Sequence, residues 1–207
     1  MSLVIGIIGE KGAGKEVVGN MIATCAFCRG ISIKRHRFSD ILNDTLRIWS
    51  ITQDRSSLQK LARMMIAEFG DSALTKAMRA KIERVDSSIM LVDGVRWETD
   101  DLMIRSFPLH ISLYVTASID TRYARSKKRN DRIGEQEKTF DQFQLEECAQ
   151  NEVYIPCIGS SADYLIVNEG TVEALREKVL SFFDRCITPK LKLQAENNFN
   201  KNNLTAL

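Results

Sequence analysis

The stretch GEKGAGKE, residues 9–16, has the residue types and the spacing needed to hold a phosphate group. Its glycines let backbone N–H groups approach a phosphate, and a helix that begins here adds the positive end of its dipole. Lys15 could reach the β- and γ-phosphates of a nucleotide as a point charge. The spacing is that of G-x-x-x-x-G-K-[ST], a motif that lies between a strand and a helix. The predicted nucleotide-binding residues of this stretch are Gly9, Gly12, Ala13, Gly14, Lys15 and Glu16.

Glu16 departs from this motif, which has serine or threonine at the last position. That hydroxyl normally ligates the Mg²⁺ that bridges the nucleotide phosphates. A carboxylate can also bind Mg²⁺, and nucleotide affinity would then depend strongly on the metal. Two alternatives stay open. Either Glu16 points to solvent while the metal is held elsewhere, or the chain binds nucleotide without catalysing a reaction.

The stretch LVDGVRWETDD, residues 91–101, offers a second set of groups for phosphate chemistry. Asp93 follows a buried apolar run, where a carboxylate can hold Mg²⁺ or its water. Arg96 could grip a phosphate during its transfer. The alternative is a capped turn with a surface ion pair. We therefore predict Glu16 and Asp93 as metal ligands, and Lys15, Asp93 and Arg96 as catalytic residues.

The stretch TRYARSKKRNDR, residues 121–132, places Arg122, Arg125 and Arg129 on one helical face, with Arg132 just beyond it. An arginine face of this kind suits a lid that closes over a polyphosphate. The alternatives are a solvated basic helix or a contact with RNA. RNA is the least favoured, because only Tyr123 interleaves the basic residues and the net charge of the chain is just +2.

These residues need a parallel sheet to bring them together. The candidate strands cover residues 3–8, 31–38, 89–92, 110–115 and 164–167, and the first is an uninterrupted apolar run. Helical patterns alternate with them at about 15–27, 40–49, 56–69, 71–84, 98–106, 118–130, 139–152 and 171–184. This alternation predicts an α/β fold with helices on both faces of the sheet. Active sites in such sheets lie beyond the carboxyl ends of the strands, where Gly9, Asp93, Thr116 and Asn168 follow strand ends.

The bulk properties narrow the classes of protein. A chain of 207 residues with 44% apolar and 27% charged residues is typical of one globular domain. The start has no basic segment of a signal peptide, and no apolar stretch approaches membrane-spanning length, so we expect a cytoplasmic location and no membrane partner. Five cysteines are expected to be reduced, because the C-x-x-C at 25–28 lacks a second metal-ligand pair.

The order of the segments adds a resemblance. The phosphate-binding loop is followed by RFSD, SSLQKLARMMIAEFG, DGVRWETD, the arginine-rich stretch and ADYLIVNEGTVEALREKV. This order, over about residues 3–184, resembles the P-loop kinases of small phosphate acceptors. It is most similar to the branch of deoxynucleoside monophosphate kinases and dephospho-CoA kinases.

The resemblance implies a fold and a domain plan. The fold would be the P-loop NTPase three-layer sandwich, with a parallel sheet of roughly five strands. One domain would cover 1–186, with an acceptor-binding helical insert at about 40–85 and a lid at about 120–135. Residues 187–207 are asparagine-rich, and we predict a mobile tail there.

The resemblance also implies site residues and a reaction. Arg125 and Arg129 would be lid arginines, and Asn168 to Gly170 would border the adenine of ATP. The residues implied on the acceptor side are Phe38, Ser39, Asp40 and Arg55. The reaction would be Mg²⁺-dependent transfer of a phosphoryl group from ATP to a small phosphorylated acceptor, foremost a nucleoside or deoxynucleoside monophosphate. The alternatives are a dephospho-CoA kinase-like activity or, because of Glu16, a non-catalytic nucleotide-binding protein. Nucleic acid is not an expected partner.

Overall fold

The computed structural model describes residues 2–128, 138–149 and 152–204, with the side chains of Arg55 and of residues 197–204 excepted. Five strands form one sheet in the order β2-β3-β1-β4-β5, and every neighbouring pair is parallel. Their bounds are β1 (Leu3–Ile8), β2 (Ile33–Arg37), β3 (Ile89–Val95), β4 (His110–Thr116) and β5 (Tyr164–Val167). The central strand β1 is buried along its whole length, as expected for an apolar run covered on both faces. The predicted parallel sheet is confirmed.

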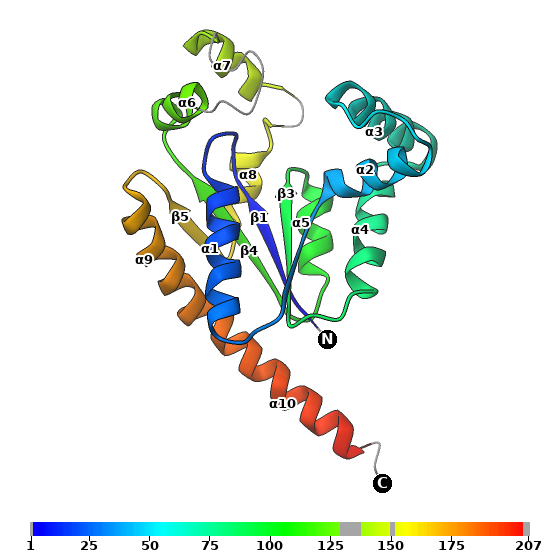
Figure 1. Cartoon of the computed structure of the whole chain (residues 1–207), viewed down its shortest axis with the longest axis vertical. Coiled ribbons are helices and arrows are strands. Elements are labelled where there is room, and N and C mark those ends of the chain that lie inside the picture. Colours follow the sequence, from blue (N-terminus) through cyan, green and yellow to red (C-terminus); the bar gives the residue numbers. More distant parts are fainter. Residues whose placement is uncertain (1, 129–137, 150–151, 205–207) are drawn as a thin grey trace.

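Helices cover both faces of this sheet. Their bounds are α1 (Lys15–Cys28), α4 (Ala73–Glu83), α5 (Glu98–Arg105), α8 (Ile155–Ser160) and α9 (Val172–Phe182). Alternate residues of β1 point to opposite faces. Leu3, Ile5 and Ile7 belong to an apolar cluster with α1 and α9, whereas Val4 and Ile8 belong to a second cluster with α4, α5 and α8. Figure 1 shows the resulting three layers, so the predicted sandwich is confirmed.

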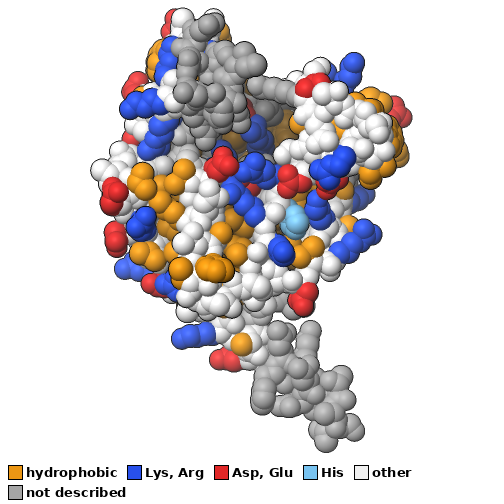
Figure 2. All heavy atoms as spheres, viewed as in Figure 1, with side chains coloured by type: hydrophobic (Ala, Val, Ile, Leu, Met, Phe, Trp, Pro, Cys, Tyr) orange, Lys and Arg blue, Asp and Glu red, His pale blue; other side chains and the backbone are white. Residues whose placement is uncertain are grey.

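Two groups of helices project beyond the carboxyl edge of the sheet (Figure 1). They are α2 (Phe38–Ile48) with α3 (Arg55–Phe69), and α6 (Ile119–Lys128) with α7 (Phe140–Glu147). An apolar cluster of its own, built on Leu42, Leu46 and Leu61, joins α2 to α3. The ring of Tyr123 in α6 packs on Phe140 of α7, with ring centroids 5.3 Å apart. Acidic and basic side chains gather between the two projections (Figure 2).

The segment after the lid differs from the prediction. The helix expected over 139–152 is α7, which begins after the N-cap residue Thr139 and ends at Glu147. A separate short helix, α8, follows at Ile155–Ser160 with Pro156 in its first turn. Proline fixes the backbone angle needed at a helix start. The predicted helix thus extends beyond the end of α7, and α8 is a helix that the sequence pattern did not predict.

The end of the chain packs further than the predicted domain boundary. A π-helical turn, η1 (Phe183–Ile187), leads into α10 (Thr188–Leu204), so a helix occupies most of the predicted tail. Ile187 is fully buried and Leu191 packs against the core, because these residues continue the apolar face of α9 at a spacing of four. Beyond them α10 extends away from the body (Figure 1), and its mobility stays a prediction. Neither α10 nor any other helix among the described residues is long and apolar enough to cross a membrane.

Replacing Ile187 with alanine tests whether the folded core includes this residue. We expect Ile187→Ala to lower the free energy of unfolding by about 2–4 kcal/mol, because it leaves a cavity beneath α9. The control is Leu193→Ala, at a half-exposed position of the same helical segment, which should change that free energy by less than about 0.5 kcal/mol. Urea denaturation of both variants provides the measurement. Equal effects would place the end of the core before Ile187.

Candidate active site

The turn from β1 to α1 has no room for side chains at its glycines. A Cβ at Gly9 would collide with the Val115 carbonyl oxygen of β4, and one at Gly14 would collide with the Asn168 amide. A Cβ at Gly12 would lie 2.7 Å from the Arg122 carbonyl oxygen of α6. Gly12 and Gly14 also have positive φ angles of 79° and 97°, which strain any residue with a Cβ. The turn is thus held by the sheet, by α6 and by the loop after β5.

Lys15 begins α1 and folds back over this turn. Its Nζ donates hydrogen bonds to the carbonyl oxygens of Gly9 at 2.5 Å and Glu10 at 2.8 Å. Burial first, and then the nearby Arg96, lower the pKa of the Lys15 ammonium to about 8, while carboxylates around it act in the opposite direction. A second positive charge therefore lies close to Lys15. An anion that entered here would restore the ordinary pKa of the lysine.

Asp93 and Glu16 are linked through arginines of β2. In the parallel pairing of β2 with β3, Arg37 lies opposite Asp93. The Asp93 carboxylate accepts a hydrogen bond from Arg35 Nη2 at 2.6 Å, and Arg37 Nε lies 3.6 Å from it. Glu16 Oε1 accepts from Arg37 Nη2 at 3.1 Å. Arg37 therefore bridges the two predicted metal ligands, although the Glu16 side chain is also 53% exposed.

This arrangement fits a divalent cation. Two carboxylates from different elements, Glu16 of α1 and Asp93 of β3, converge on one positive group. Hard oxygen ligands of this kind suit Mg²⁺, which keeps waters and phosphate oxygens in the rest of its shell. Among the described residues no three His, Cys, Asp or Glu side chains form a metal cluster by themselves. A metal here would therefore arrive with phosphate ligands.

Arg96 is held by two acidic residues. Its guanidinium pairs with Glu152, which precedes α8. Its backbone N–H, with that of Trp97, donates to the Asp100 carboxylate at 3.0 and 3.2 Å, which caps α5. Burial raises the pKa of the Asp100 carboxyl to about 6, although these two hydrogen bonds lower it. Asp100 therefore fixes the turn that carries Arg96 at the cost of its own desolvation.

Arg125 and Asn168 meet above the turn. Arg125 Nη2 donates to the Asn168 carbonyl oxygen at 2.9 Å, and Asn168 Nδ2 donates to the Ala13 carbonyl oxygen at 2.9 Å. Arg125 Nη1 is buried and has no hydrogen-bond partner among the described residues. A buried guanidinium nitrogen without a partner fits an anionic ligand such as a nucleotide phosphate. Gly170 follows Asn168 by two residues, in the loop between β5 and α9.

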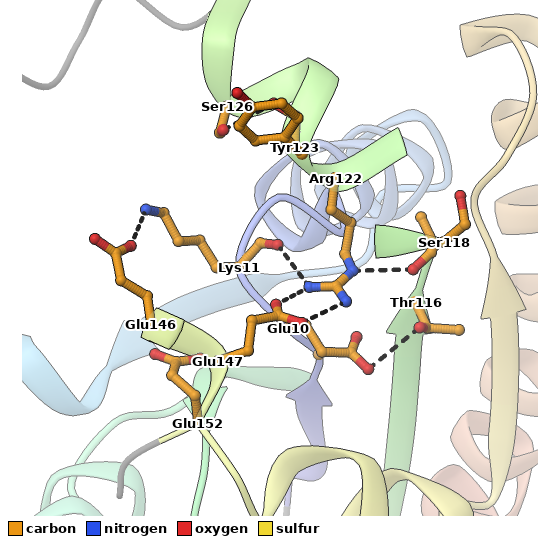
Figure 3. A network of polar contacts seen from close by, with 12 residues as sticks. Glu10, Lys11, Thr116, Ser118, Arg122, Tyr123, Ser126, Glu146, Glu147 and Glu152 are labelled. Carbon is orange, nitrogen blue, oxygen red and sulfur yellow. Dashed lines mark hydrogen bonds and ion pairs between the residues drawn. The ribbon is translucent and has the colours of Figure 1, made fainter. Parts of the chain in front are cut away.

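Arg122, predicted to share the phosphate-facing stripe, has a different role. It is buried and forms a two-pronged ion pair with Glu147 of α7, and its Nε donates to the Ala117 carbonyl oxygen at 2.9 Å. Figure 3 shows this network, in which Lys11 of the turn also pairs with Glu146 of α7 at 2.9 Å. Arg122 thus joins α6 to α7. Arg129, also of the stripe, lies outside the described residues.

The predicted acceptor residues stand at the start of α2 and α3. Phe38 is partly buried against the core, and Ser39 is exposed in the first turn of α2. Asp40 caps that helix, because its carboxylate accepts from the Arg37 backbone N–H at 2.7 Å. Arg55 begins α3, and its side chain lies outside the described residues. Their contact with an acceptor stays a prediction.

Sequence reasoning missed four residues of this site: Glu10, Arg35, Arg37 and Glu152. Glu10 accepts hydrogen bonds from Tyr114 and Thr116 of β4, and its second carboxylate oxygen is buried without a partner among the described residues. The two arginines could have been found, because alternate residues of a strand share a face and β2 leads directly to the site. No local signal identifies Glu152, which pairs with a residue 56 positions away.

Comparison with known proteins supports the fold. No family model matches the chain. It is 27% identical over 183 residues to a protein of Hyperthermus butylicus named UPF0200 protein, covering 88% of this chain and 94% of that one. A shikimate kinase from Bacteroides thetaiotaomicron matches with a TM-score of 0.55 at 13% identity, covering 88% of this chain and 98% of the other. A shikimate kinase from Acinetobacter baumannii in complex with shikimate gives 0.50 at 14% identity, covering 88% and 93%. The chain therefore has the P-loop NTPase fold found in these kinases.

The capping carboxylate Asp100 gives a pH-dependent prediction. Its pKa is about 6 in the folded protein against 3.8 ordinarily, so the folded state binds more protons than the unfolded state between these values. The contribution of Asp100 to stability is therefore present below pH 4 and lost as pH rises to 6. Asp100→Asn removes this pH-dependent contribution to stability while keeping an oxygen acceptor. From pH 4 to 7, we expect the variant to gain about 2–3 kcal/mol of unfolding free energy relative to the unsubstituted protein.

Urea titrations at pH 4, 5, 6 and 7 measure this difference. A control without a titratable side chain is Ser56→Ala, at an exposed position of α3, whose difference from the unsubstituted protein should stay constant over the same range. A constant difference for Asp100→Asn would contradict the buried, destabilised carboxylate.

Proposed function

We propose that this protein transfers the γ-phosphoryl group of ATP to a small phosphorylated acceptor, with nucleoside and deoxynucleoside monophosphates as the favoured class. The observation that carries the proposal is the glycine turn around the partly buried Lys15, with Asp93 and Arg96 close to it. The Arg125 nitrogen, which has no partner among the described residues, and the P-loop NTPase fold add to it. In-line phosphoryl transfer requires positioning and charge neutralisation rather than covalent chemistry, and these are the groups that supply both.

Each residue has a distinct part in this proposal. Lys15 would exchange its bonds to the turn carbonyls for phosphate oxygens, and Arg125 would offer its free nitrogen to the same phosphates. Asp93 and Glu16 would orient Mg²⁺, which neutralises charge on the phosphates when it is bound. Arg96, kept in place by Glu152, would grip the transferred or accepting phosphate.

The surroundings of Arg96 favour an acceptor with a base. Trp97 and Tyr154 follow Arg96 and Glu152 closely in the chain, and their rings lie 5.8 Å apart. Tyr154 is half exposed. Aromatic rings can stack a nucleobase. The position of this pair in the chain, next to Arg96 and Glu152, is the reason for placing a nucleotide ahead of a sugar or a hydroxy acid as the acceptor.

A screen for ADP release tests the proposal. The acceptors are nucleoside monophosphates, deoxynucleoside monophosphates, dephospho-CoA and shikimate, each with Mg²⁺ or Mn²⁺. We expect turnover with a monophosphate, and we expect Lys15→Ala to lower kcat/KM by about 10²–10³-fold. Lys34→Ala, on the exposed side of β2, is the matched control and should retain activity. ATP binding without turnover on any acceptor would favour the non-catalytic alternative.

The lowered pKa of Lys15 predicts how nucleotide affinity depends on pH. In the free protein its ammonium loses a proton near pH 8, and a bound phosphate would raise that pKa again. The complex then holds one proton more than the free protein above pH 8. ATP affinity should fall by up to about tenfold per pH unit from pH 8 to 10.

Isothermal titration between pH 7 and 10 measures this fall directly. Lys15→Arg keeps a charge throughout this range, so its affinity should change less steeply. The same slope in both proteins would assign the effect to another group.

A further inference from the structure

We propose that Arg37 and a divalent cation compete for the same two carboxylates, Glu16 and Asp93. Arg37 would then be the resident counter-ion of an exchangeable cation site. The link to nucleotide chemistry rests on the proposed function, but the competition itself concerns only these side chains and the metal.

The geometry places one guanidinium between two carboxylates from separate elements. Arg37 Nη2 lies 3.1 Å from Glu16 Oε1, and Arg37 Nε lies 3.6 Å from Asp93 Oδ2. Glu16 belongs to the first turn of α1, Asp93 to β3 and Arg37 to the end of β2. A cation placed between these carboxylates would take the position that the guanidinium holds. The two cannot occupy it together.

Exposure indicates that Arg37 can leave. The side chains of Arg37 and Glu16 are 46% and 53% exposed, and ion pairs this open to water contribute little to stability. The Arg37 backbone N–H is fixed separately by Asp40 at 2.7 Å. The guanidinium can therefore swing out while β2 and α2 keep their places.

Arg35, on the same strand, is held much more firmly. Its side chain is 20% exposed, and it donates to Asp93 at 2.6 Å and to Asn20 at 2.8 Å. It also packs on Gly19 of α1, where an added Cβ would lie 2.9 Å from the guanidinium carbon. Arg35 thus fixes one face of Asp93 permanently. Of these two arginines, Arg37 is the exchangeable one.

The charges give the exchange a physical reason. Arg37 pairs with Glu16 at 3.1 Å, so its removal in the absence of metal would leave more of the negative charge of Glu16 to repel incoming phosphates. A divalent cation compensates Glu16 and Asp93 and also binds phosphate oxygens, whereas a guanidinium compensates them by pairing alone. Nucleotide with metal would therefore displace Arg37, and nucleotide without metal would leave it in place.

Titration with Mn²⁺ in the absence of nucleotide tests the competition, with free Mn²⁺ followed by electron paramagnetic resonance. Arg37→Gln should bind Mn²⁺ about tenfold more tightly than the unsubstituted protein, because the competing charge is gone. Lys34→Gln removes one positive charge from an exposed position of the same strand and should leave the affinity unchanged. Equal or weaker Mn²⁺ binding by Arg37→Gln would overturn the proposal.

Glu16→Gln supplies a second variant that keeps Arg37. It should bind Mn²⁺ more weakly than the unsubstituted protein, since one ligand is lost, and unchanged affinity would count against the site. Thermal unfolding of each variant establishes that it is folded before titration.

ADP binding separates this proposal from the proposed function. Without metal, Arg37→Gln should bind ADP about tenfold more weakly than the unsubstituted protein, because Glu16 then repels phosphate. With Mn²⁺, the two proteins should bind ADP alike or the variant more tightly. A loss in Arg37→Gln that Mn²⁺ does not restore would overturn the exchange. ADP affinity that Lys15→Ala leaves unchanged would contradict the proposed function, while the Mn²⁺ titration would still decide the role of Arg37.

Discussion

The absence of space around the β1–α1 turn is the constraint on which the rest of the site depends. A side chain at Gly9 would meet β4, one at Gly12 would meet α6, and one at Gly14 would meet the Asn168 amide. The same three contacts therefore set the shape of the turn and the positions of α6 and of the loop after β5. Helix α6 rests directly on the turn through Arg122, which also holds α7 through Glu147. The shape of the turn that would bind a phosphate therefore depends on several elements at the carboxyl edge of the sheet, and not on the turn alone.

Charge balance is the second organising feature. Four arginines at this edge, all among the described residues, are engaged with a carboxylate or a carbonyl group: Arg35 and Arg37 with Asp93, Arg96 with Glu152, and Arg125 with Asn168. Lys15 is bound to backbone carbonyls and carries a lowered pKa. A phosphate that enters would therefore exchange with existing partners at most of these groups, while Arg125 Nη1, which has no partner among the described residues, could bind it directly. Such exchange favours ligands that satisfy several of these groups at once, which suits a polyphosphate with metal better than a single anion.

The sheet and the turn could be predicted because their signals are local. An apolar run such as Leu3–Ile8 followed by glycines and a lysine specifies strand, turn and helix within fifteen residues. The hydrogen-bond and ion-pair partners of the site residues could not be predicted, since they depend on tertiary contacts. Arg122 and Arg125 share one helical face in the sequence, yet Arg122 is buried against Glu147, while one nitrogen of Arg125 has no partner in the described part of the chain. Spacing alone does not distinguish them, because the difference comes from α7. Likewise α10 continues the apolar face of α9 through Ile187, although the composition after it indicated a tail.

The departure from the motif at Glu16 acquires a meaning beside Arg37. A hydroxyl at this position is neutral, and it would leave the Arg37 guanidinium to Asp93 alone, which Arg35 already binds at 2.6 Å. The group formed by Asp93, Arg35 and Arg37 has one negative and two positive charges. Glu16 balances the second positive charge by pairing with Arg37 at 3.1 Å. The negative charge of Glu16 on α1 thus balances positive charge of the basic strand β2. Glu16 is therefore accounted for by the charge of its neighbours, and its presence does not by itself argue for the loss of phosphoryl transfer.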